Sequence, residues 1–439
     1  MKEISQGKLL TKWLIRALII LLIMMGMVYR HWFALIAFGL NLILLLFAEE
    51  EDLIAELFFV LPFASVYKYA PGSTSFVTML ELAAVLILFA RKRTMPVNNY
   101  LILAVMWLAY LVCGEVFSRS LHLTELIKHA AGLLIIYYGI ENKNLTAEKT
   151  IIALCCGLLI SSVIALFADH IPHFYAYVRK IGYNPEITNR FTGMNGDPNY
   201  YSITLILCLL GAMMIRRKHP VFFWAMLAAT GLFGFKTYSK SFFLIFLIVL
   251  LVILVELRKD HQKRSLAVFL SLIAVFTALT FMGRLSGVTS ILFRLDQAEN
   301  FSQLTTGRTD LWAKYLRVIF SDPLRSLVGG SLSARVIDGK GVHCFYLEMV
   351  YYFGLAGAAL FFSTIFSAFL SAIRPNRASD AGLAAVSVIA IMYLFLQMLF
   401  SNELFFHLFY LILLCRYSAK PGQALSARTQ PADPSAAGD

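Results

Sequence analysis

The chain has 439 residues, of which 59% are hydrophobic and only 15% are charged, and its mean hydropathy is +0.73. A soluble domain usually carries about 25% charged residues and cannot bury this much apolar surface. Apolar segments long enough to cross a bilayer core of about 30 Å recur along almost the whole sequence. The chain is therefore predicted to be an all-α, polytopic membrane protein, because these continuous runs exclude the alternating segments of a β-barrel.

About fourteen candidate spans can be placed, and about twelve remain without the weakest pair, 53–70 and 403–416. The first of these contains Glu56 and Pro62, and the second is short. The predicted spans are 13–29, 32–48, 53–70, 75–90, 97–114, 124–140, 150–168, 200–216, 220–236, 241–257, 266–282, 345–372, 381–400 and 403–416.

The net charge of +12 is distributed unevenly over the connections between these spans. Cytoplasmic loops of membrane proteins are enriched in Lys and Arg, so the uneven distribution predicts that both termini are cytoplasmic. Much of the positive charge thus has a topological origin and does not indicate nucleic-acid binding. The basic connections contain Arg91-Lys92-Arg93, Lys143 with Lys149, Arg216-Arg217-Lys218, Arg258-Lys259 with Lys263-Arg264, Arg374 with Arg377, and Arg416 with Lys420.

Residues 1–417 are predicted to form a single transmembrane domain, followed by a disordered cytoplasmic tail at 418–439 that is rich in Ala, Pro, Ser and Gln. The six cysteines lie mostly in apolar runs, and their spacing matches neither a metal site nor a disulfide framework. We therefore interpret them as small hydrophobic residues.

Two long connections, at about 169–199 and 283–343, are predicted on the outer side of the membrane, and loops of this length are usually functional or disordered. The second contains several arginines, including Arg294 and Arg308. Its segment 307–324 has the apolar periodicity of an amphipathic helix, which Thr305 or Thr306 would cap and Pro323 would end. The apolar face comprises Leu311, Trp312, Tyr315, Leu316, Ile319 and Phe320.

The first loop ends in the polar stretch TNRFTGMNGDPNYYS, residues 188–202. Asp197 is predicted to cap the following helix, with Pro198 at its first position. Arg190 beside a helix N-terminus is typical of an anion site. The alternative is that Asp197 and Pro198 only cap the helix while Arg190 reaches toward lipid headgroups.

Two further polar segments border predicted spans. The turn KTYSKS (236–241) carries Lys236 and Lys240, which are either functional or extended toward the membrane surface. The segment GVHCFYLEMVYYFGLAG (341–357) carries His343 near Glu348. His343 is either a passive polar residue at the interface or, facing the arginines of the outer loops, a proton acceptor or phosphate ligand.

In this order, these segments resemble the O-antigen ligase and O-antigen polymerase superfamily of membrane glycosyltransferases. RFTGMNGDPNYYS resembles its Arg–Gly–x–Pro–Asn element, and TYSKS its Thr–x–Ser–Arg turn. TTGRTDLWAKYLRVIFSDPLRSLVGG resembles its Gly–Arg–x–x–x–Trp helix, and GVHCFYLEMVYYFGLAG its closing His–Asn–x–Tyr–Leu element. The chain departs from the family where Lys240 replaces Arg, where Cys344 replaces Asn, and where Gly329-Gly330 is displaced from Gly–x–Gly.

The resemblance implies a glycosyltransferase-C-like fold and a metal-independent enzyme without cofactors. It would transfer or polymerise oligosaccharide from undecaprenyl diphosphate to a glycan or lipid-linked acceptor, on the outer face of the cytoplasmic membrane. Membrane lipids are expected partners and nucleic acid is not. The implied catalytic residues are Arg190, Arg308 and His343, and the implied substrate-binding residues are Lys240, Arg294, Asn199 and Trp312.

Other classes of membrane protein remain open. A transporter or flippase for an anionic or lipid-linked cargo would show inverted repeats and charges at the membrane midplane, and neither pattern is apparent in the sequence. A non-catalytic scaffold would explain the spans but not the ordered polar segments. Ligase and polymerase share a donor site, and the sequence does not distinguish them.

Overall fold

The computed structural model describes residues 2–92, 95–119, 122–142, 145–178, 190–259, 263–281, 307–373, 380–398 and 403–417, together with positions 288, 292, 296, 302 and 305. Within these ranges the regular structure is helical and no strand occurs. Six of the described helices, namely α1, α5, α6, α7, α11 and α17, contain a segment long and apolar enough to cross a membrane. The all-α prediction is confirmed, and the apolar helices support a membrane-embedded protein.

The α-helices have the following bounds: α1 Lys2–Val28, α2 Trp32–Phe47, α3 Glu50–Val60, α4 Phe76–Arg91, α5 Asn99–Phe117, α6 Leu123–Glu141, α7 Ala147–Ala165, α8 Phe174–Val178, α9 Pro198–Met214, α10 Pro220–Lys236, α11 Lys240–Lys259, α12 Lys263–Phe281, α15 Arg308–Phe320, α16 Pro323–Val328, α17 Phe345–Ile373, α18 Asp380–Met392 and α19 Glu403–Arg416. Short 3-10 turns are η1 Leu61–Phe63, η2 Ala168–His170 and η4 Tyr393–Phe395. Most predicted spans coincide with one of these helices.

Two predicted spans are wrong in extent. The span at 53–70 is helical only to Val60, continues as η1 to Phe63 and then turns. Pro62 lies in η1 and lacks the N–H that would continue an α-helix. The span at 381–400 ends with η4, and the described residues 396–398 are non-helical because their backbone groups bond to other segments instead.

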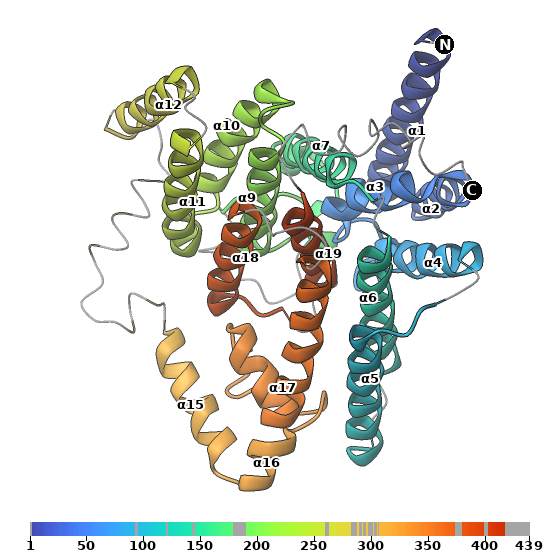
Figure 1. The fold of residues 1–439 in the computed structure, drawn as a ribbon, viewed down its shortest axis with the longest axis vertical. Helices are drawn as coiled ribbons and strands as arrows, with labels where there is room; N and C mark the ends of the chain where they lie inside the picture. Colours follow the sequence, from blue (N-terminus) through green and yellow to red (C-terminus); the bar gives the residue numbers. More distant parts are fainter. Residues whose placement is uncertain are drawn as a thin grey trace, which may run out of the picture.

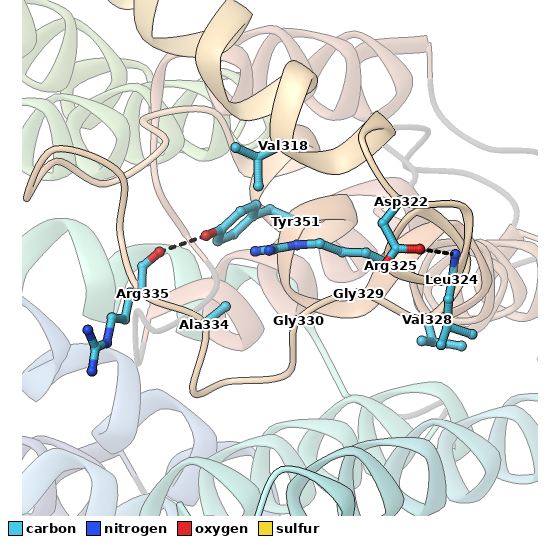
Figure 2. A pocket seen from close by; sticks show the side chains of 10 residues that line it. All are labelled: Val318, Asp322, Leu324, Arg325, Val328, Gly329, Gly330, Ala334, Arg335 and Tyr351. Carbon is cyan, nitrogen blue, oxygen red and sulfur yellow. Dashed lines mark hydrogen bonds between the residues drawn. The ribbon is translucent and has the colours of Figure 1, made fainter.

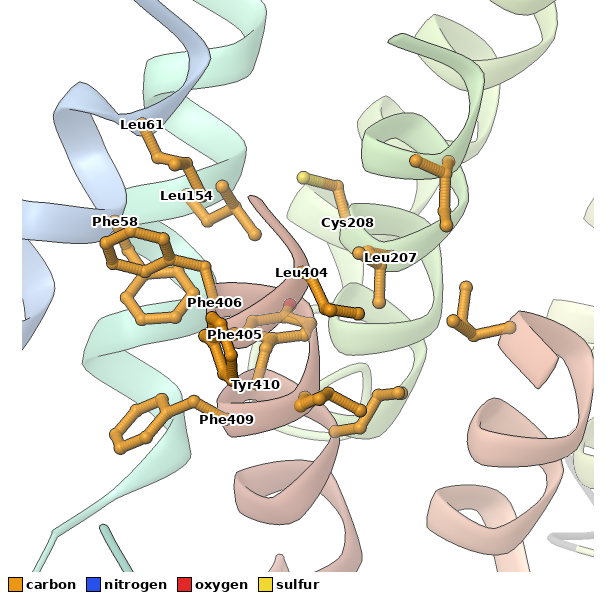
Figure 3. Packing of buried hydrophobic residues seen from close by; sticks show 14 of the residues in the cluster. Phe58, Leu61, Leu154, Leu207, Cys208, Leu404, Phe405, Phe406, Phe409 and Tyr410 are labelled. Atoms are coloured by element: carbon orange, nitrogen blue, oxygen red, sulfur yellow. The ribbon is translucent and has the colours of Figure 1, made fainter. Parts of the chain in front are cut away.

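The core is built around α9 and α19, whose residues are almost all buried. Figure 3 shows side chains of α19 packed between α3 and α7 on one side and α9 on the other. Close approach of α6 to α19 needs glycine, because a Cβ at Gly132 or Gly139 would lie 2.2 or 2.4 Å from Phe405 or Phe409. Small residues allow this kind of close packing between membrane helices.

The remaining helices are arranged around this core (Figure 1). Helices α10 to α12 lie on one side of α9, while α1 to α6 lie on the opposite side of the view. Helices α15 and α16 pack on α17 and form the lower part of the molecule in this view.

Candidate functional site

The end of the first long connection packs against the turn between α10 and α11. Arg190 Nε donates a hydrogen bond of 2.7 Å to the carbonyl oxygen of Thr237. The backbone N–H of Phe191 donates to the carbonyl of Lys236 at 2.9 Å. These two hydrogen bonds hold Arg190 against the turn 236–239. The residue is partly buried there.

The N-terminus of α9 is fixed by the predicted cap. Asp197 Oδ1 accepts hydrogen bonds from the backbone N–H groups of Asn199 at 2.7 Å and Tyr200 at 3.3 Å. Pro198 occupies the first helical position, so both predictions for this helix start are confirmed. Asn199 Oδ1 accepts a hydrogen bond of 2.9 Å from Ser239 Oγ, which joins the starts of α9 and α11.

The start of α15 is attached to the segment that follows α18. Arg308 Nη1 donates a hydrogen bond of 2.7 Å to the carbonyl oxygen of Phe395. The predicted cap by Thr305 or Thr306 is wrong, because the N-cap of α15 is Gly307, in a left-handed conformation and without a side-chain cap bond. Thr305 Oγ1 still accepts a hydrogen bond of 3.4 Å from the N–H of Thr309. Trp312 Nε1 donates to the carbonyl of Val342 at 3.0 Å, which places Trp312 beside the residue that precedes His343.

The segment before α17 completes this region. His343 adopts a left-handed backbone conformation, with φ of 53°, which a non-glycine residue rarely takes. Within α17, Glu348 Oε2 accepts a hydrogen bond of 3.0 Å from the N–H of Met398. The hydroxyl of Tyr200 donates to the carbonyl of Gln397. Residues 395–398 therefore connect α9, α15 and α17.

Asp197, Arg308 and His343 lie close enough to influence one another electrostatically. Partial desolvation lowers the pKa of Arg308, and the charge of Asp197 opposes this shift. Partial desolvation also lowers the pKa of His343 below its ordinary value of 6.5, and the neighbouring Arg308 guanidinium lowers it further. The side chain of His343 remains accessible to solvent. At neutral pH, His343 is therefore uncharged and able to accept a proton.

Several helices begin at this site. The first residues of α9, α11, α15 and α19 are Pro198, Lys240, Arg308 and Glu403, and α17 begins directly after Cys344. Contacts already described connect the starts of α9, α11 and α15, and Asp197 lies within electrostatic range of Glu403. The N-terminus of a helix carries a partial positive charge and unpaired N–H groups. At α9 and α15, however, Asp197 and Thr305 already accept hydrogen bonds from some of these N–H groups, and Asp197 and Glu403 add negative charge. The attraction for an anion therefore rests chiefly on the basic side chains.

The structure brings most of the predicted site residues into this one region. Arg190, Asn199 and Lys240 lie at the starts of α9 and α11, while Arg308, Trp312 and His343 lie at the starts of α15 and α17. Residues 197–200 lie between these two sets of residues. Asp197 caps α9 and interacts electrostatically with Arg308, and the Tyr200 hydroxyl donates to the carbonyl of Gln397. Arg294 lies outside the described residues, as does the predicted tail at 418–439.

Sequence analysis missed residues that the fold places at the site. The backbone carbonyls of Phe395 and Gln397 hold Arg308 and Tyr200, yet a carbonyl leaves no signal in a sequence. Glu403 and His407 are buried with 4.0 Å between Glu403 Oε2 and His407 Nε2. Their spacing of four residues inside an apolar run is a visible signal, because charged residues within membrane helices are usually functional.

Metal binding needs convergent ligands, and the described residues contain no group of His, Cys, Asp and Glu side chains arranged to hold a metal ion. Compared with known proteins, the chain matches no protein-family model and no curated protein.

Proposed function

We propose that the protein is an integral membrane glycosyltransferase that transfers or polymerises an undecaprenyl-diphosphate-linked oligosaccharide. The observation that supports the proposal is that Arg190 and Arg308 are each held by a backbone carbonyl near the starts of α9, α11 and α15. His343 lies within electrostatic range of Arg308, and Lys240 is the first residue of α11. This arrangement suits a diphosphate, because arginine side chains bind phosphate oxygens in a bidentate way and keep their charge. The apolar helices around the site suit a polyprenyl chain.

The proposed reaction breaks the bond between the anomeric carbon of the donor sugar and the diphosphate oxygen. The acceptor hydroxyl oxygen forms the new bond to that carbon. His343 takes the hydroxyl proton, because its lowered pKa leaves the imidazole neutral at pH 7. The electron pair of the broken bond stays on the diphosphate, and Arg190, Arg308 and Lys240 stabilise the added negative charge.

The proposal includes an orientation. About twelve to fourteen membrane-crossing segments, with both termini in the cytoplasm, would place the connections 169–199 and 283–343 outside the cytoplasmic membrane. The fold would then be of the glycosyltransferase-C type. The positive-inside distribution of Lys and Arg supports this orientation. The site would face the side on which lipid-linked glycans are presented.

A transporter for an anionic or lipid-linked cargo is the second candidate, and one observation favours it. Helix α17 is interrupted at Gly354, whose φ of 64° is not helical, and transporters often use broken helices at their binding sites. The two functions differ in their products. Transfer leaves a new glycosidic bond and free lipid diphosphate, whereas transport leaves the cargo unchanged.

Substitution of the proposed diphosphate ligands tests the function in cells. In a deletion strain, the native protein should restore the surface polysaccharide, and Arg190→Ala and Arg308→Ala should each fail to do so. The reason is that loss of one transition-state contact slows a reaction about 10²–10³-fold. Arg317→Ala is the matched control, because Arg317 is exposed on α15. Polysaccharide of normal amount and length in both variants, at equal protein levels, would refute the proposal.

A further inference from the structure

A pocket lies at the far end of α15, where α16 packs against α17. It has a volume of about 530 Å³ and is open to the surface. The walls include Val318, Asp322, Arg325, Val328, Ala334 and Tyr351. Figure 2 shows Arg325 extending across the pocket toward the Tyr351 ring, while the guanidinium group of Arg335 points away from it. Helix α15 has 13 residues, so this pocket lies about 20 Å from Arg308.

The backbone around the pocket is packed too closely to be an adaptable loop. Gly329 and Gly354 both have positive φ, of 78° and 64°. A Cβ on Gly329 would lie 2.4 Å from the backbone nitrogen of Gly354. The hydroxyl of Tyr110 on α5 is 3.0 Å from the carbonyl of Val328 and 2.8 Å from that of Phe353. The pocket is therefore preformed by α5, α16 and α17.

Arg325 is the cation of this pocket. Its guanidinium carbon lies 5.1 Å from the centre of the Tyr351 ring. Its Nε atom is buried and has no hydrogen-bond partner among the described residues. Asp322 forms no ion pair with Arg325 within the part of the chain that the structure describes, and its Oδ1 accepts a hydrogen bond of 2.9 Å from the N–H of Leu324 as the cap of α16. A buried donor without a partner is costly, so a ligand acceptor is expected there.

Apolar side chains border the pocket and are exposed. Leu324 and Val328, which line the pocket, are 66% and 44% exposed. Phe320 on α15 and Leu327 on α16 are 62% and 54% exposed. The pocket also lies beside a candidate membrane span, since Tyr110 and Glu115 of α5 contact the segment 328–332. The boundary between lipid headgroups and acyl chains favours apolar side chains next to a positively charged group. The exposed leucines beside the span and the cation in the pocket have this arrangement.

From these observations we propose that the pocket binds the phosphate group of a membrane lipid. The guanidinium of Arg325 holds the phosphate oxygens, and the Nε–H finds its missing acceptor there. The hydrocarbon chain of the lipid lies along Phe320, Leu324 and Leu327. This site is separate from the site at Arg308, and it does not depend on the proposed glycosyl transfer.

Binding of short-chain lipids to the purified full-length protein in neutral detergent tests this site. Native protein should bind dioctanoyl phosphatidic acid, measured by titration calorimetry, and should bind dioctanoylglycerol, which lacks the phosphate, at least ten times more weakly. Arg325→Gln should weaken phosphatidic acid binding by about 10- to 100-fold, because it removes charge-assisted hydrogen bonds. Arg325→Lys keeps the charge and should lose less.

A matched control separates this site from general lipid association. Arg317→Gln should leave binding unchanged, because Arg317 is exposed on α15 and does not line the pocket. Equal affinity of native protein and folded Arg325→Gln for phosphatidic acid would overturn the proposal. If Arg325→Gln does not fold, unchanged binding in Arg325→Ala or equal binding of both lipids by native protein would overturn it. Inorganic phosphate that binds as tightly as the lipid would exclude a lipid as the occupant.

Discussion

His343 shows at the scale of a residue how the fold changes the chemistry that the sequence allows. A histidine at a membrane interface is ordinarily close to half-charged near pH 6.5. Here the surrounding protein and the charge of Arg308 both disfavour the imidazolium form. The residue that would activate an acceptor hydroxyl is therefore held in the form that accepts a proton.

The pH dependence of His343 follows from this arrangement. In native protein its pKa should lie below 6.5, so activity that needs the neutral ring should persist as the pH falls to that value. Arg308→Gln removes a positive neighbour and should raise the pKa of His343 toward 6.5. Titration of histidine ring resonances by NMR, assigned with His343→Asn, measures both values. A His343 pKa that falls or stays constant in Arg308→Gln would contradict the electrostatic account, and Arg317→Gln serves as the control.

At the scale of an element, the contact between α16 and the break in α17 fixes the lower part of the molecule. A Cβ on Gly354 would lie 2.3 Å from the carbonyl oxygen of Leu327 and 2.5 Å from the nitrogen of Gly329. The left-handed conformation of Gly354 adds a second requirement for glycine. The position of α16 relative to α17 depends on this contact.

Paired alanine substitutions separate these requirements. Gly339 has a φ of 66°, close to that of Gly354, but a Cβ there would meet no atom within 4 Å. Gly339→Ala should therefore cost only the strain of the left-handed conformation, about 1–2 kcal/mol. Gly354→Ala should cost about 1–3 kcal/mol more, because the added methyl group also forces backbones apart. Apparent melting temperatures in detergent compare the pair, and equal losses would contradict the close contact.

Much of the element pattern was predictable, because apolar runs flanked by caps and prolines determine where helices begin and end. The start of α9 at Pro198 and the extent of α10 follow this logic. The end of α18 was not predictable, since 396–398 leaves the helix to bond to Tyr200 and Glu348, which are distant in sequence. The spacing of Glu403 and His407 was a visible signal in the sequence, but the proximity of Glu403 to Asp197 follows only from the fold.

At the scale of the whole molecule, the polar segments from four distant parts of the chain meet around the buried helices α9 and α19. Each segment begins a helix or ends a turn near the start of α9. The basic side chains and the helix N-termini therefore lie in the same region. The apolar helices around them suit a substrate that has a lipid chain and an anionic head. We propose that this site breaks the bond between a glycan and its lipid diphosphate.

The most direct test uses purified protein in liposomes that contain an undecaprenyl-diphosphate-linked oligosaccharide and a matching acceptor. The measurement is release of undecaprenyl diphosphate together with the glycan product, without nucleotide sugar, metal or ion gradient. Native protein should release both in equal amounts, and Arg308→Gln should do so about 10²–10³-fold more slowly, with Arg317→Gln unchanged. Native protein that releases no lipid diphosphate, or an Arg308→Gln variant that releases it at the native rate, would contradict the account.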